Sequence, residues 1–392
     1  MRKQFLSKIA QTSEIPSLFQ IKRASGVYLW DMSDQKYLDF HSGFSVNNIG
    51  HSNPRVLKGI ELQAANYLHS SVYGDHIQSP QIKLAHELCN LLPPSLNAVY
   101  FLNSGSEAVD TAVKLAKKIT GKGEVIACNN AYHGSTMLPE SLRSDREHNR
   151  SIRPLMPGVR FIEFNEIKEL DKINSETACV IIEPIQAEAG IRLPSDTYLK
   201  ALSARCQEVG CLLLFDEIQT GFGRTGQLFA FQNYDCIPDI LICGKALGAG
   251  LPLSALIAER SLLAHFENNP ALSHLSTFGG NPLCCAAALE GLKVLLDERC
   301  IENSVKNASL IVDKMQHPMI KDIRFSGLFM AVQFETEKVC WNVMRELYEE
   351  KILVESFLFC PSALRVSPPL IVNEKECLYF VEILLKILNE RM

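Results

Sequence analysis

The stretch Pro238-Asp-Ile-Leu-Ile-Cys-Gly-Lys-Ala-Leu-Gly-Ala-Gly-Leu-Pro252 places a lysine, Lys245, directly after a run of apolar residues. The run Ile240–Cys243 is typical of a buried strand, and the glycines and proline after it predict a turn. A lysine at the end of a buried strand must be paired or neutralised. Loss of water also lowers the basicity of its amine and makes it a usable nucleophile. The stretch alone leaves open a lysine exposed to solvent beyond the strand.

Strand-like apolar runs recur from residue 98 onward, and helical patterns separate most of them. We count seven: Ala98–Leu102, Glu124–Cys128, Val159–Phe164, Ala178–Ile182, Cys211–Phe215, Asp239–Cys243 and Leu253–Ala258. This alternation predicts an α/β fold with a mainly parallel seven-stranded sheet that is flanked by helices. The last run follows the sixth too closely for a crossover helix, so we expect it to be antiparallel. In such sheets ligands bind beyond the carboxyl ends of the strands.

The remaining patterns predict a second, smaller α+β domain. A hairpin pattern covers Gly26–Asp31 and Lys36–Phe40, and helical patterns cover 55–68 and 79–91. After residue 283 come two helical stretches, then strands, then a terminal helix from Asn373. The strands are Phe329–Phe334, Ile352–Val354 and Leu364–Val366. We therefore divide the chain into an N-terminal segment and hairpin that contribute to the small domain (1–50), a large domain (51–283) and a C-terminal small domain (284–392).

Composition limits the function classes. Of the 392 residues, 47% are hydrophobic and 21% are charged, as in an ordinary soluble globular protein. The net charge of −5 predicts neither a nucleic-acid nor a membrane partner. The chain shows no signal-peptide pattern and no long uncharged apolar run, so we expect a cytoplasmic protein. The 13 cysteines include no Cys-x-x-Cys pair, which predicts reduced thiols and no metal site.

Polar residues with chemical potential follow several of the predicted strands. Asn103-Ser-Gly-Ser-Glu opens a helix after the first run, so Ser104, Gly105 and Ser106 could hold an anion such as phosphate. An ordinary serine N-cap is the alternative interpretation of the same residues. The second run is followed by Asn129-Asn-Ala-Tyr-His-Gly-Ser-Thr, in which Tyr132 could lie flat against a planar ligand or could simply pack in its loop.

Acidic residues follow two further runs. Glu183-Pro-Ile-Gln-Ala-Glu-Ala-Gly follows the fourth run, where a solvated acidic turn is the alternative. Asp216 ends the apolar run of the fifth strand, so we expect it to be partly buried and to need a partner. The same stretch spells a dinucleotide-binding pattern at Gly221, Gly223 and Gly226. However, those glycines do not directly follow the strand, and no phosphate-capping helix comes after them.

Together these residues place a phosphate site, an aromatic wall, a buried acid and an amine nucleophile at successive strand ends of one sheet. Pyridoxal phosphate asks for all four, since its aldehyde needs a lysine and its pyridine nitrogen needs an acid. The sequence also resembles the class III aminotransferases, fold-type I pyridoxal-phosphate enzymes, over nearly its whole length. The resemblance rests on Asp216-Glu-Ile-Gln-Thr-Gly-Phe-Gly-Arg-Thr-Gly, on Lys245 with its glycines, and on Ser276-Thr-Phe-Gly-Gly-Asn-Pro-Leu.

The resemblance implies a role for each cofactor-binding residue. Lys245 would hold pyridoxal 5'-phosphate as a Schiff base and carry the proton, and Asp216 would pair with the pyridine nitrogen. Gln219 would contact the ring hydroxyl, and Tyr132 would stack on the ring. The rest of the predicted cofactor-binding set is Ser104, Gly105, Ser106, His133, Glu183 and Thr277. Thr277 would come from the neighbouring subunit, which implies a homodimer whose active sites are shared across the interface.

The resemblance also predicts substrate-binding residues. Arg365 would bind the α-carboxylate of glutamate or of a keto acid, and Glu188 would neutralise it when another substrate end enters. Phe44 stands where the ornithine enzymes have a tyrosine. Ser135 stands where acetylornithine, ornithine and 4-aminobutyrate enzymes have an arginine that binds a carboxylate, and a hydroxyl cannot replace that contact.

These residues favour an aminotransferase that moves a terminal amino group from an amino acid or amine to a keto acid by a ping-pong mechanism. The favoured acceptor is 2-oxoglutarate, with pyruvate second. An aminomutase, decarboxylase or phospho-lyase on the same fold is the first alternative. A nucleotide-binding oxidoreductase that uses the glycine run near Gly221 is a remote one, and a catalytically inactive binding protein is disfavoured by the Lys245–Asp216 pair.

Overall fold

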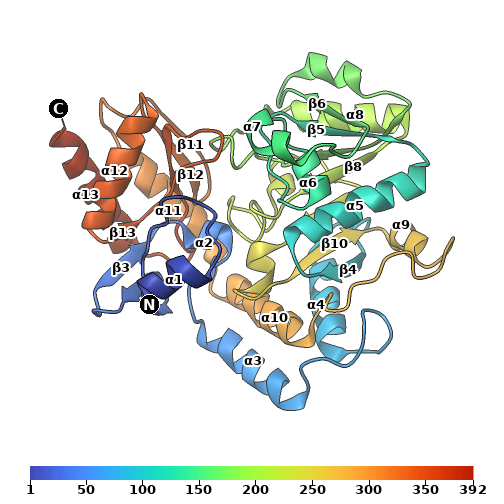
Figure 1. The fold of residues 1–392 in the computed structure, drawn as a ribbon, viewed down its shortest axis with the longest axis horizontal. Coiled ribbons are helices and arrows are strands. Elements are labelled where there is room, and N and C mark those ends of the chain that lie inside the picture. Colours follow the sequence, from blue (N-terminus) through green and yellow to red (C-terminus); the bar gives the residue numbers. More distant parts are fainter. Residues whose placement is uncertain (392) are drawn as a thin grey trace.

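A seven-stranded sheet forms the larger part of the molecule (Figure 1). The computed structural model describes residues 1–391. In the order of the sheet, the strands are β4 (Ala98–Leu102), β10 (Ser254–Ala258), β9 (Ile240–Cys243), β8 (Leu212–Asp216), β7 (Thr177–Ile182), β5 (Glu124–Cys128) and β6 (Val159–Ile162). Only β10 runs against its neighbours β4 and β9. The predicted sheet and its antiparallel last strand are thus confirmed.

Helices cover both faces of this sheet. The long helix α5 (Gly105–Thr120) buries its small and β-branched residues against one face, together with residues of β9 and β10. The side chain of Ser104 caps its first turn, and Gly121, with φ of 68°, ends it in the left-handed conformation that glycine adopts easily. On the other face lie α8 (Tyr198–Val209), α4 (Ser79–Asn90) and α10 (Pro282–Asp297). Helix α10 packs against both α4 and α3 (Pro54–Asn66).

Two smaller sheets and three helices form the second part of the molecule, to the left in Figure 1. One sheet has the order β1 (Ile21–Ser25), β2 (Tyr28–Asp31), β3 (Lys36–Asp39) and β13 (Ile352–Leu353). The other has the order β11 (Asp322–Ser326), β12 (Phe329–Gln333) and β14 (Ala363–Val366). The helices are α11 (Cys300–Lys314), α12 (Glu337–Glu349) and α13 (Glu374–Asn389). The hairpin and the terminal helix agree with the prediction, whereas β1, β11 and α12 were not predicted.

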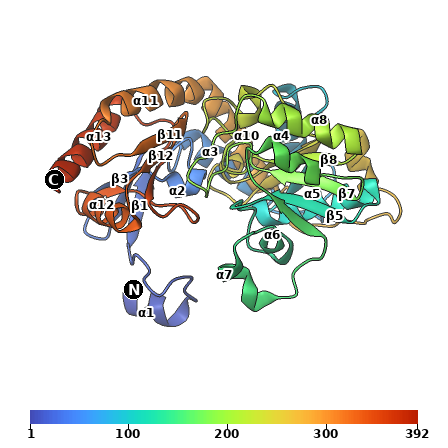
Figure 2. The same cartoon turned by 90° about the horizontal axis from the view of Figure 1, so that it is seen from above.

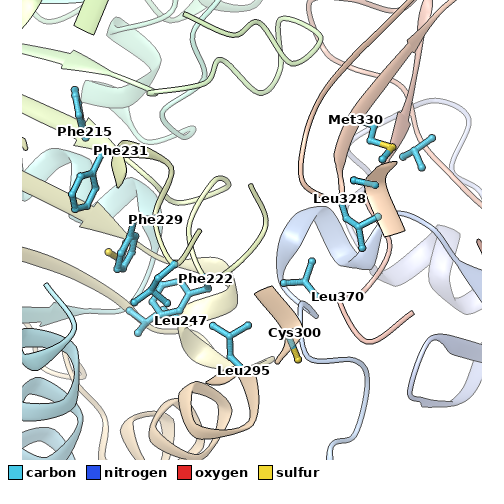
Figure 3. Close-up of a cluster of buried hydrophobic side chains, with 14 of the residues drawn as sticks. Phe215, Phe222, Phe229, Phe231, Leu247, Leu295, Cys300, Leu328, Met330 and Leu370 are labelled. Carbon is cyan, nitrogen blue, oxygen red and sulfur yellow. The ribbon is translucent and has the colours of Figure 1, made fainter. Parts of the chain in front are cut away.

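The hydrophobic core runs without a break from one part to the other (Figure 3). Phe215 and Phe231 lie near the large sheet, and Phe222 and Leu295 continue the cluster to Leu370 in the second part. Because the parts share one core, close packing holds them in a fixed relative position. The proposed domain limits at residues 50 and 284 stay predictions, and the second limit falls inside α10, which packs against α3 and α4.

The remaining elements are short. They are α1 (Arg2–Lys8), α2 (Ser42–Ser45), α6 (Met137–Ser141), α7 (Arg146–Asn149) and α9 (Arg260–Leu263). Helix α1 has no buried residue and stands away from the three sheets in Figure 2. Within residues 1–391, no helix combines the length and the apolar character needed to cross a membrane. All thirteen cysteines are free, and all but Cys89 and Cys360 are buried, as the sequence predicted for reduced core thiols.

Candidate functional site

A cavity of about 340 Å³ lies where strands of the large sheet end. It is lined by residues that follow β4, β5, β7, β8 and β9. The lining residues are Gly105, Ser106, Tyr132, His133, Gly134, Ser135, Glu183, Asp216, Ile218, Gln219 and Lys245. Because the carboxyl ends of parallel strands meet at one edge of a sheet, side chains distant in the sequence converge here. The structure therefore brings together eight of the predicted cofactor-binding residues.

Lys245 begins the turn Lys245–Gly248 directly after β9, and its side chain faces the cavity. Its φ of 46° lies in the left-handed region, which is unusual for a residue other than glycine and is concentrated at functional sites. Removal from water lowers the pKa of its amine from 10.5 to about 8. The carboxylate of Glu188 partly offsets this effect, and the nearby Arg365 adds to it. Lys245 is half-buried and lines the cavity, so it is not the fully exposed lysine that the stretch alone had left open.

Asp216 is buried at the end of β8 and has two donors from the protein. Its Oδ2 lies 2.7 Å from Nδ1 of His133, and its Oδ1 accepts the backbone N–H of Ile218 at 3.1 Å. Burial lowers the pKa of His133, but the hydrogen bond and charge of Asp216 outweigh it, so the pKa is raised overall. Nε2 of His133 is buried and has no partner within the described chain. The two hydrogen bonds therefore hold the Asp216 carboxylate in one orientation toward the cavity.

Glu183 lies near Asp216 and His133 and holds the loop that carries Tyr132. Its carboxylate accepts the backbone N–H groups of Tyr132 at 3.2 Å and of Ala187 at 2.9 Å. Burial raises its pKa to about 7, because the charged form has little solvent and Asp216 is near. The Tyr132 hydroxyl lies 3.1 Å from the Ser135 hydroxyl. Glu183 thus acts on the loop of Tyr132 through the backbone.

The opposite end of the cavity is built around the N-terminus of α5, where free backbone N–H groups and the helix dipole favour an anion. Gly105 and Ser106 line it, whereas the Ser104 hydroxyl accepts the backbone N–H of Glu107 at 3.1 Å. The Ser106 hydroxyl accepts the N–H of Ser135 at 2.9 Å. A Cβ on Gly134, whose φ is 124°, would come within 2.0 Å of that hydroxyl. Only glycine fits this approach.

A second polar cluster adjoins the cavity through Gln219. The fully buried Arg365 of β14 donates to Oε2 of Glu188 at 2.6 Å and to Oε1 of Gln219 at 3.0 Å. Gln219 in turn donates to the other oxygen of Glu188 at 3.0 Å. Burial raises the pKa of Glu188, but Arg365 outweighs burial and the pKa is lowered overall. The rings of Phe44 and Phe357 lie 5.1 and 4.4 Å from the Arg365 guanidinium.

Two predicted residues have other surroundings. Thr277 is exposed and does not line the cavity of its own chain. The Ser104 side chain caps helix α5 instead of lining the cavity. Two residues that line the cavity were not predicted, Ile218 and Gly134. Ile218 could have been found, because it stands two residues after Asp216, in the turn that follows the strand.

Comparison with known proteins gives a consistent result. The family model for aminotransferase class-III matches residues 9–388. An acetylornithine aminotransferase from Methanothermobacter thermautotrophicus is 34% identical over 94% of both chains. A putrescine aminotransferase from Pectobacterium atrosepticum is 36% identical over 91% of this chain and 79% of its own. A solved ornithine aminotransferase from Toxoplasma gondii, with partial occupancy of PLP at its active site, has a TM-score of 0.90 at 29% identity and covers 100% of this chain and 94% of its own.

The lowered pKa of Lys245 predicts how its reactivity depends on pH. In the cofactor-free protein, condensation of Lys245 with a small aldehyde should rise with pH around a midpoint of about 8, because only the neutral amine is a nucleophile. The adduct can be trapped with borohydride and quantified by mass spectrometry, with the surface lysines of the same digest as controls. A midpoint near 10.5, the value of an unperturbed lysine, would contradict the assigned environment.

Proposed function

The chain belongs to the class III aminotransferases, which depend on pyridoxal 5'-phosphate, and from this premise we propose that it moves a terminal amino group to a keto acid. The favoured acceptor is 2-oxoglutarate, and pyruvate is second. One observation carries the proposal: a buried arginine, Arg365, paired with Glu188, adjoins the cavity that contains Lys245. A guanidinium at this place suits the α-carboxylate of a keto acid.

The cavity fits the cofactor in its donor set and its shape. Lys245 supplies the amine for the aldehyde, and Asp216, buried and oriented by His133, suits the pyridine nitrogen. The N-terminus of α5 at Gly105 suits the phosphate, and the absence of a side chain at Gly134 keeps that end open. Tyr132 provides an aromatic wall for the ring.

When bound, pyridoxal phosphate supplies an aldehyde for the donor's amino group and a ring that withdraws electrons from the neighbouring carbon. Asp216 keeps a proton on the ring nitrogen, since a buried carboxylate stabilises the adjacent positive charge. The neutral Nζ of Lys245, freed by the donor, takes a proton from the carbon that bears the amino group and returns it to a neighbouring position. Hydrolysis by water releases the carbonyl product before the keto acid binds, which gives ping-pong kinetics.

Glu188 lets one cavity accept two kinds of substrate. While an amine donor without a nearby carboxylate is bound, Glu188 neutralises the buried guanidinium of Arg365, because an unpaired buried charge is costly. When a dicarboxylic acceptor enters, its carboxylate takes the place of Glu188. Ser135 contributes a hydroxyl in place of a guanidinium to the lining of the cavity, which favours diamines or ω-amino donors over donors that need a second arginine.

We extend the proposal to a homodimer with shared sites. Thr277 is exposed and lies outside the cavity of its own chain, which supports a role for it at the phosphate of the second subunit. The free thiols of the chain suit a reducing compartment, and we place the enzyme in the cytoplasm.

The proposed reaction predicts a spectral change without any acceptor. A suitable donor, added alone to the purified enzyme, should convert the bound cofactor from its aldehyde form to its amine form within one turnover. A panel of ω-amino acids, diamines, ornithine derivatives and simple amines, followed by absorbance, identifies the donor. If no amine in the panel causes the conversion, the aminotransferase proposal fails. Release of carbon dioxide or phosphate without conversion would favour a decarboxylase or phospho-lyase.

The assignment of Arg365 predicts a selective loss. Arg365→Ala should reduce kcat/KM for 2-oxoglutarate by about 30-fold to several thousand-fold, because a buried charge-paired contact is lost. This loss corresponds to roughly 2–5 kcal/mol of transition-state stabilisation. The donor half-reaction with a diamine should change far less. Arg345→Ala, the same change at an exposed position on α12, is the matched control. Unchanged KM and kcat for the acceptor would remove Arg365 from the site.

A further inference from the structure

Four consecutive residues beside the cavity have a left-handed backbone. The φ angles of Ser42, Gly43, Phe44 and Ser45 are 46°, 60°, 59° and 67°. Only Gly43 adopts this conformation at little cost, because a Cβ in the left-handed region crowds the following carbonyl oxygen. Three strained residues among four persist only where the surrounding structure fixes them. Contacts from elsewhere in the chain must therefore hold this turn.

Asp39 holds the start of the turn. It is fully buried, and its Oδ1 accepts the backbone N–H groups of His41 at 3.0 Å and of Ser42 at 2.7 Å. Its other oxygen lies 2.7 Å from Nε2 of His51. The N–H of Gly43 donates to Nδ1 of His41 at 3.1 Å. The first residues of the turn are thus bound through their backbone.

Arg224 holds the turn through a side chain. Its fully buried guanidinium donates to the Ser42 hydroxyl at 3.0 Å and to Oδ1 of Asn48 at 2.6 Å. Its other terminal nitrogen donates to the carbonyls of Leu328 at 2.8 Å and of Pro368 at 2.7 Å. Pro368 follows Arg365 by three residues in the chain. One guanidinium therefore ties the left-handed turn to the segment that carries the carboxylate-binding arginine.

Phe44 is the side chain that the turn presents. Its ring lies 5.1 Å from the guanidinium of Arg365, on which the ring of Phe357 also lies at 4.4 Å. Phe44 is 40% exposed, so it stands between the buried Arg365 and solvent. An aromatic face over a guanidinium attracts the cation and displaces water from it. A rotation of the turn would withdraw this ring from Arg365.

We infer that Arg224 and Ser42 are positioning residues for the carboxylate subsite. Their hydrogen bond keeps the turn left-handed and keeps Phe44 over Arg365, so that a dicarboxylate binds a guanidinium shielded from water. The inference rests on the proposed function, in which Arg365 binds the acceptor. It also gives a role to the glycine run near Gly221, since that run brings Arg224 to the turn.

The chain contains a matched pair of serines for the test. Ser42 and Ser45 are both buried and both left-handed, but the Ser45 hydroxyl has no hydrogen-bond partner within the described residues. In the holoenzyme, Ser42→Ala should weaken binding of glutarate, a dicarboxylate without a keto group, by about tenfold, because a charge-assisted hydrogen bond is lost. Calorimetry measures this dissociation constant independently of turnover. The KM for 2-oxoglutarate should rise in parallel, and the donor half-reaction and the Ser45→Ala variant should stay within about twofold of wild type.

Ser42→Gly keeps the test valid if the alanine variant fails to fold, because glycine removes the hydroxyl and accepts the positive φ. It should show the same loss for glutarate. Equal effects of the changes at Ser42 and Ser45, or equal losses in both half-reactions, would overturn the inference. Arg365→Ala separates this failure from a wider one. If Arg365→Ala leaves glutarate binding unchanged, the proposed function fails; if it weakens binding and the Ser42 variants do not, only the inference fails.

Discussion

The constraint on which the site depends is the burial of a carboxylate at the end of a central strand. Asp216 is only 3% exposed, and a charge so placed must be held by donors. His133 and the backbone of Ile218 provide two, from different segments of the chain. Both contacts orient the carboxylate toward the cavity that Lys245 also faces. The acid and the amine nucleophile are thus fixed relative to each other before any ligand binds, which is what a preorganised site requires.

In the proposed function, the loop after β8 connects the residues that bind the cofactor to those that bind the substrate. In this proposal Asp216 binds the cofactor, and Gln219, three residues later, lines the cavity and accepts a hydrogen bond from Arg365. Arg224, five residues further, reaches the turn that carries Phe44. A shift of this loop would therefore move the acid, the carboxylate subsite and its aromatic cover together. The glycines of the loop allow this close packing. The pattern that resembles a dinucleotide-binding motif therefore has a structural explanation that needs no dinucleotide.

The sequence predicted the large sheet well because its strands are buried on both faces and appear as continuous apolar runs. The short edge strands β1 and β11 were missed, since Ile21–Ser25 and Asp322–Ser326 carry charges and lie near the surface. Helix α12 could have been found from Cys340, Val343 and Leu347, its buried residues at helical spacing. The strand ends indicated eight of the residues that line the cavity. The contacts of Arg224 and the left-handed turn depend on segments far apart in the chain, and no local pattern encodes them.

A crystal structure of the enzyme with pyridoxal phosphate would show directly whether Lys245 and Asp216 hold the cofactor. We expect continuous density from Nζ of Lys245 to the cofactor, with Asp216 within hydrogen-bond distance of the pyridine nitrogen and the phosphate at Gly105 and Ser106. A cofactor bound in another cavity, attached to another lysine, or turned so that its pyridine nitrogen faces away from Asp216 would contradict this expectation.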